Sequence, residues 1–137
     1  MAKDKFHYNV KEALIKDGWS ITADPLAIPI EITTIEIDLA AEMAIGAEKD
    51  GYKIAVEIKS FLSKSPISEF HMAMGQYGDY REALEESEPD RLLYLAVPVE
   101  IFETFFQARF IKKRIEQERV KLLIYEPDAK TIVEWIN

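Results

Sequence analysis

The chain has 137 residues, of which 48% are hydrophobic and 31% are charged, and its net charge at pH 7 is −8. This size and composition predict one globular domain over residues 1–137, while the absence of cysteine excludes disulfides and thiolate metal sites. No apolar run reaches the ~20 residues of a membrane span and no secretory signal is recognisable, so we expect a cytoplasmic protein with no membrane partner.

The first third of the chain predicts a helix followed by short strands. Residues 6–17 have apolar side chains at helical spacing, and Gly18 follows as a glycine that suits the helix end. Residues 19–32 favour β structure but contain Pro25 and Pro29, which indicates short or edge strands.

Two further strands are expected to form a hairpin. Residues 34–40 alternate between apolar and polar side chains, as a half-buried strand does. Residues 42–48 and 52–60 are then predicted to pair as a hairpin, because Asp50-Gly51 between them is a strong turn signal.

The second half of the chain predicts alternating helices and strands. Residues 66–86 and 99–118 have helical patterns, whereas residues 92–97 form an almost wholly apolar run, as a buried strand does. Residues 120–126 and 131–136 are expected to be a final pair of strands. The predicted order is therefore α-β-β-β-α-β followed by α-β-β, a mixed central β-sheet flanked by helices in the α/β or α+β class.

One triplet carries the residues best suited to chemistry. Glu57 and Lys59 are two apart on a predicted strand, so they share one face with Ile58 between them. If the preceding strand is its neighbour, Asp38 reaches the same patch. Two carboxylates and the backbone carbonyl of Ile58 can hold Mg²⁺ or Mn²⁺, and Lys59 can assist an attacking water. The alternative is a surface ion pair on an ordinary strand.

Four further residues are candidates for support of that site. Gln76 and Tyr80 are four apart on a predicted helix and so lie on one face, where Gln76 can bond a water, a carboxylate or a phosphate. Glu12 is a candidate acidic ligand, and His7 is a candidate phosphate contact or proton shuttle. The alternatives are that Gln76 and Tyr80 form a polar helix margin, that Glu12 is a lone surface glutamate, and that His7 is a capping or packing histidine.

This arrangement of motifs resembles a known superfamily. Asp38, then Glu57-x-Lys59 on a hairpin arm, then a helix with Gln76, is similar to the PD-(D/E)xK nucleases. The resemblance implies a restriction-endonuclease-like core, which fits residues 6–97, and metal-dependent endonuclease activity on DNA. The motif is degenerate, since Ile37 stands where that superfamily has proline.

A longer resemblance extends over nearly the whole chain. Its strings are Ala2–Asp4, Ala13–Trp19, Asp38–Glu42, Ile54–Phe61, Gly75–Tyr77, Pro89–Arg91 and Tyr94–Pro98. They are similar to the XisH family, the fdxN-element excision controlling factors. The resemblance implies a role in programmed DNA rearrangement in cyanobacteria, where such proteins assist a site-specific recombinase alongside a XisI-type partner protein.

Three functions remain open from the sequence. The chain is a Mg²⁺-dependent endonuclease or resolvase-like enzyme, a non-catalytic accessory protein that binds DNA, a XisI-type partner or a recombinase, or a nuclease restrained by a partner of the toxin–antitoxin kind. The acidic charge favours the accessory protein. So do the phenylalanines of residues 99–118, which cover more than one helix face and indicate core packing or a homodimer or partner surface.

Overall fold

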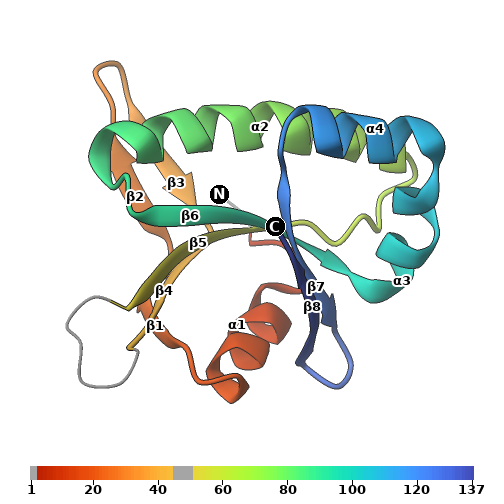
Figure 1. Cartoon of the computed structure of the whole chain (residues 1–137), viewed down its shortest axis with the longest axis horizontal. Helices are drawn as coiled ribbons and strands as arrows, with labels where there is room; N and C mark the ends of the chain where they lie inside the picture. Colours follow the sequence, from red (N-terminus) through yellow and green to blue (C-terminus); the bar gives the residue numbers. More distant parts are fainter. Residues whose placement is uncertain (1–2, 45–50) are drawn as a thin grey trace.

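The computed structural model describes residues 3–44 and 51–137. Its elements form a central sheet with helices on both faces (Figure 1). In chain order they are α1 (His7–Lys16), β1 (Ser20–Ala23), β2 (Leu26–Pro29), β3 (Thr34–Ile37), β4 (Leu39–Met43), β5 (Tyr52–Ile58), α2 (Pro66–Ser87), β6 (Arg91–Pro98), α3 (Val99–Glu103), the 3₁₀ helix η1 (Phe105–Gln107), α4 (Arg109–Gln117), β7 (Lys121–Glu126) and β8 (Thr131–Ile136).

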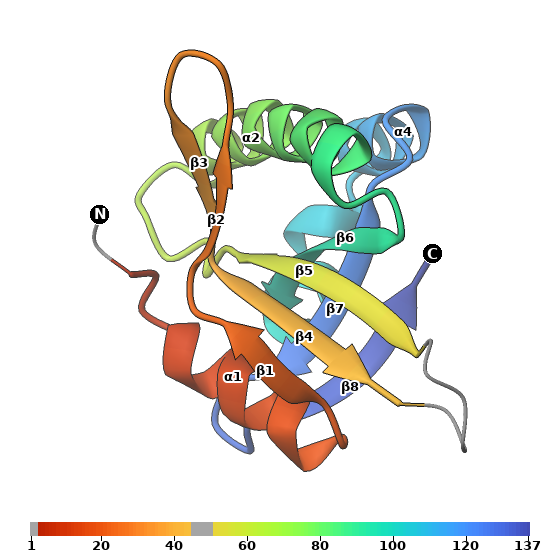
Figure 2. The ribbon, with the colours of Figure 1, turned by 90° about the vertical axis from the view of Figure 1, so that its left-hand side faces the viewer.

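The main sheet has six strands in the order β1-β4-β5-β6-β7-β8. β5, β6 and β7 are parallel, and β1, β4 and β8 are antiparallel to their neighbours, which makes the sheet mixed as the element order predicted. α1 covers one face, and α2 and α4 cover the other (Figures 1 and 2). In the described part of the chain, no helix is both long enough and apolar enough to span a membrane.

The helix ends agree with the signals in the sequence. α1 ends at Lys16 and is followed by Gly18, whose φ of +96° suits glycine, and the N–H of Trp19 donates back to the carbonyl of Leu14. α2 begins after Ser65, whose side chain accepts from the N–H of Ser68, and Pro66 occupies the first turn, where no amide hydrogen is needed.

The alternation predicted for β5 is confirmed. Ile54, Val56 and Ile58 pack in the apolar cluster beneath α1, while Ala55 packs in the cluster beneath α2. Because side chains alternate along a strand, Glu57 lies on the α2 side of the sheet with Ala55.

The prediction of one strand over residues 34–40 is wrong. β3 ends at Ile37 and pairs with β2 in a separate two-stranded sheet, and β4 begins at Leu39. The break falls at Asp38, whose backbone and side chain both bond to β5 instead of continuing a ladder. The hairpin partner of β5 is β4, which begins before the predicted arm over residues 42–48. Glu42 and Met43 of that arm pair with Lys53 and Tyr52, and residues 45–48 lie outside the described residues. The predicted turn at Asp50-Gly51 falls partly outside the described residues.

The prediction of one helix over residues 99–118 is also wrong. The segment divides into α3, η1 and α4, with Thr104 and Ala108 in non-helical conformations. Phe105 and Phe106 both contact Phe61, with ring centroids 6.0 and 5.3 Å away.

Candidate active site

Asp38 lies beside Glu57 at the end of β5, where one hydrogen bond joins it to Glu57 and a second joins it to Ile58. The N–H of Asp38 donates to Oε1 of Glu57 at 3.3 Å, and the N–H of Ile58 donates to Oδ2 of Asp38 at 2.8 Å. The strand register explains the meeting. Leu39 lies opposite Val56, so the next position outward brings Asp38 beside Glu57. One carboxylate from the break between β3 and β4 and one from β5 thus share one small volume.

The electrostatics of Glu57 are unusual for a carboxylate. Its side chain is only 8% exposed. Burial, followed by the negative charge of Asp38, raises the pKa of Glu57 from 4.5 to about 8, although Lys59 acts in the opposite direction. Glu57 therefore favours its protonated form at neutral pH. A metal cation bound beside it would displace that proton.

Lys59 and Tyr80 border the two carboxylates. Nζ of Lys59 lies 3.7 Å from Oε2 of Glu57, and its side chain is 15% exposed. Tyr80 is buried on α2. Burial, and then the charges of Glu57 and Asp38, raise the pKa of Tyr80 to about 12. Its hydroxyl thus lies within electrostatic reach of both carboxylates and keeps its proton.

Gln76 precedes Tyr80 by one helical turn and leaves an acceptor unsatisfied. Its Oε1 is buried and has no hydrogen-bond partner among the described residues. Because an unpaired buried acceptor costs free energy, this position favours a ligand or water that brings a donor.

The oxygen donors at this point fit a hard divalent cation. Lys59 donates its N–H to Ala96 on β6, so the adjacent Ile58 directs its backbone to the opposite edge, where its N–H meets Asp38. The carbonyl of Ile58 shares that edge. The described residues contain no group of three or more histidine or acidic side chains suited to a metal. Mg²⁺ needs only one or two carboxylates when waters and phosphate oxygens complete its shell.

His7 and Glu12 lie on α1, which packs against the other face of the sheet. Nε2 of His7 is 2.7 Å from Oδ1 of Asp24, and Lys11 donates to the same carboxylate at 2.9 Å. Burial alone would raise the pKa of Asp24, but hydrogen bonds from Lys11 and His7 lower it. Glu12 makes no hydrogen bond or ion pair in the described part of the chain. Roles for His7 and Glu12 in catalysis stay predictions.

Asp4 positions the end of β5, although no motif in the sequence marks it as part of the site. Its Oδ2 accepts from the N–H of Ser60 at 3.0 Å, and its Oδ1 accepts from the N–H of Phe6 at 2.9 Å. Ser60 directly follows Lys59, so this carboxylate fixes the backbone beside the site. An acidic residue just before a helix indicates a cap, but a contact across 56 positions has no local signal.

Known proteins resemble the chain along nearly its whole length. A family model described as "XisH protein" matches residues 1–133. A crystal structure of an XisH family protein from Nostoc punctiforme PCC 73102 is 50% identical, with a TM-score of 0.89, over 98% of this chain and all of that one. A fdxN element excision controlling factor protein from Anabaena variabilis is 50% identical, with a TM-score of 0.87, over 96% of this chain and 98% of that one. No curated protein sequence matches.

Proposed function

This chain belongs to the XisH family, and from this membership we propose that it acts in the excision of a DNA element as a Mg²⁺- or Mn²⁺-dependent endonuclease or resolvase-like enzyme. A similar protein carries the name fdxN element excision controlling factor, which supports the excision role. The observation that supports hydrolysis is the pairing of Asp38 with Glu57, with Lys59 3.7 Å from Glu57.

Each residue has a distinct task in the proposed reaction. Asp38, Glu57 and the carbonyl of Ile58 would hold the cation. When bound, the cation would supply Lewis acidity toward a phosphodiester oxygen and the attacking water. Lys59 would orient that water and stabilise negative charge as it develops on the phosphate. Gln76 would bond water or phosphate through the amide whose acceptor is otherwise unpaired.

Cleavage assays with matched variants test this proposal. Wild-type protein is incubated with duplex, nicked and branched DNA in Mg²⁺, in Mn²⁺ and in EDTA. We expect cleavage only with the cation, and a loss of at least about a hundredfold in Lys59→Ala. Lys64→Ala is the control, because it removes the same charge from an exposed loop residue. Absence of cleavage on all substrates, or equal cleavage by Lys59→Ala, would contradict the proposal.

A second candidate function is that of a non-catalytic accessory protein. It is favoured by the net charge of −8 and by Phe110, which is 59% exposed on α4. Such a protein would bind a XisI-type partner or a site-specific recombinase. The same exposed surface would also allow it to form a homodimer. Co-purification with a XisI-type protein that persists in Glu57→Gln but is lost in Phe110→Ser would support this function over catalysis.

A further inference from the structure

A cavity lies away from the carboxylates, at the end of the sheet where β6 and β7 begin. Its volume is about 300 Å³, and it is enclosed by the second half of α2, by the segment that leads into β6 and by the residues that join α4 to β7. Its charged lining residues are Arg81, Glu85, Arg91, Arg119 and Lys121. We call it the cationic cavity, because four of these side chains are basic and one is acidic.

The floor of the cationic cavity is held in place by Tyr77. The hydroxyl of Tyr77 donates to the carbonyl of Leu93 at 2.8 Å and accepts from the N–H of Lys121 at 3.1 Å. Arg81 donates from Nη1 to the carbonyl of Glu118, and its guanidinium lies 5.4 Å from the centroid of the Tyr77 ring. The guanidinium is thus held in position while its remaining N–H groups keep their capacity to donate.

Arg119 and Lys121 bring two more positive charges to this cavity. They flank Val120, which is buried, so the core holds the backbone from which both side chains extend, just before β7 and at its first residue. Neither side chain makes an ion pair with any residue that the structure describes. Both side chains are therefore available to bind an anion from solvent.

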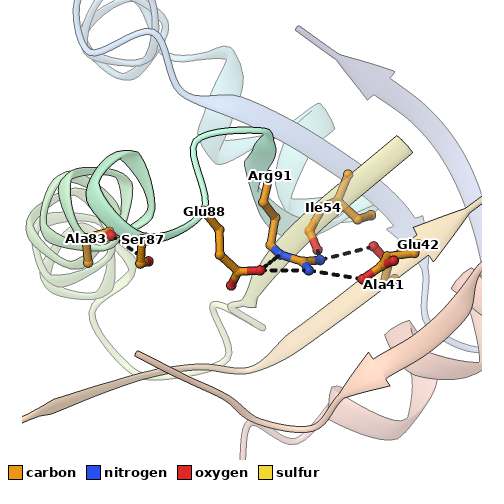
Figure 3. A network of polar contacts seen from close by, with 7 residues as sticks. All are labelled: Ala41, Glu42, Ile54, Ala83, Ser87, Glu88 and Arg91. Carbon is orange, nitrogen blue, oxygen red and sulfur yellow. Dashed lines mark hydrogen bonds and ion pairs between the residues drawn. The ribbon is translucent and has the colours of Figure 1, made fainter. Parts of the chain in front are cut away.

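The local charge is not balanced within the cavity. Arg91 also lines it, but Glu42 and Glu88 already neutralise its guanidinium (Figure 3). Glu85 is the single acidic side chain of the lining and opposes three cations. Like charges gathered in one cavity repel one another, and a bound anion relieves that repulsion.

We propose that the cationic cavity binds the phosphate group of a nucleotide, either free or within a single-stranded nucleic acid. Arginine side chains offer paired N–H donors that match phosphate oxygens, and Lys121 adds a third charge. Along the paired strands Glu57 lies opposite Leu95, four residues from Arg91, which is roughly 13 Å at the rise of a strand. The site is thus separate from the carboxylates, and the inference does not depend on hydrolysis.

Binding measurements in EDTA test the proposal. The probes are a short fluorescein-labelled single-stranded DNA and a fluorescent ATP analogue, each followed by anisotropy at low salt and displaced by inorganic phosphate. The cavity variant is Arg119→Gln with Lys121→Gln. The control is Lys112→Gln with Lys113→Gln, which removes the same charge from exposed positions on α4 outside the cavity.

We expect the cavity variant to bind at least about tenfold more weakly and the control to change by less than about twofold. Binding of the ATP analogue would identify a free nucleotide as the source of the phosphate, and binding of DNA alone would identify a strand. The measurements are made in EDTA, where the proposed hydrolysis cannot proceed, so failure of binding and failure of cleavage are distinguishable. Should the cavity variant fail to fold, Arg119→Gln alone is expected to weaken binding about threefold. Wild-type protein that binds neither probe, or equal weakening in both double variants, would overturn the proposal.

Discussion

β5 and β6 each contain one buried charged side chain, and the two lie at opposite ends of the strands in very different surroundings. Arg91 is 6% exposed and Glu57 is 8% exposed, so burial does not distinguish them. Their partners do. Arg91 is surrounded by acceptors, whereas Glu57 faces a second carboxylate and one lysine. The comparison indicates that a buried charge with full complementary partners serves the fold, whereas one without them is available for chemistry.

The surroundings of Arg91 join several elements at one point (Figure 3). Its guanidinium lies 3.1 Å from the carboxylates of both Glu42 and Glu88, and it also donates to the carbonyls of Ala41 and Ile54. These bonds connect β4, β5, β6 and the end of α2. Such complete pairing offsets the cost of removing the charge from water.

The largest effect is expected from Arg91→Met. This change leaves two strand carbonyls without their donor and should lower the free energy of unfolding by about 3 kcal/mol. Urea denaturation at pH 7 measures it. Arg114→Met is the control, because its ion pair with Glu118 is over a third exposed on both sides and should contribute less than about 0.5 kcal/mol. Equal losses in the two variants would show that Arg91 stabilises the fold no more than an exposed ion pair does.

Glu57→Gln should act in the opposite direction and stabilise the protein above neutral pH. Between pH 4.5 and about 8 the folded wild type keeps a proton that the unfolded chain has released. Unfolding releases that proton, so wild-type stability falls as pH rises through this window. The glutamine variant lacks this dependence and should be more stable than the wild type at pH 8.5, with little difference at pH 4.5.

Thermal and urea unfolding across that pH range measure the difference. Glu82→Gln removes a carboxylate from an exposed position and should leave the pH profile unchanged. The expectation is contradicted if wild-type stability rises between pH 4.5 and 8, or if Glu57→Gln has the same pH dependence as the wild type. Either result would show that the fold does not raise the pKa of Glu57.

A divalent cation should stabilise the carboxylate end of the sheet alone. At a Mg²⁺ concentration about ten times the dissociation constant, we expect wild-type stability to rise by about 1.4 kcal/mol. The increase should be larger at pH 8 than at pH 5, because the cation displaces the proton of Glu57. Asp38→Asn should abolish the increase, whereas Arg91→Met should keep it. An equal increase in Asp38→Asn would indicate that the cation binds elsewhere.

The smallest effects are expected from single changes to the partners of Arg91. The side chains of Glu42 and Glu88 are 40% and 37% exposed, so solvent replaces much of each contact. Glu42→Gln and Glu88→Gln should each cost about 0.5 kcal/mol in urea unfolding. A loss of several kcal/mol from either one would mean that a single carboxylate, and not the combined set, stabilises Arg91.

Local sequence patterns predicted most elements but failed where a distant contact interrupts a pattern. The apolar alternation of β5 and the helical pattern of α2 are properties of neighbouring residues, and both predictions are confirmed. The strand across Asp38 and the helix across Thr104 were predicted as continuous, because nothing nearby in the sequence interrupts them. In the fold, the side chain of Asp38 accepts a hydrogen bond from β5, and Phe105 and Phe106, which follow Thr104, pack against Phe61.

The sequence by itself determined that Glu57 and Lys59 share one face, since the two-residue period of a strand follows from backbone geometry alone. Only the tertiary structure decided that Asp38 joins them, because that depends on the register between β4 and β5. Tertiary structure also decided the environments of the two buried charges. Whether Arg91 meets carboxylates, and whether Glu57 meets another acid, depends on residues far apart in the chain that packing brings together.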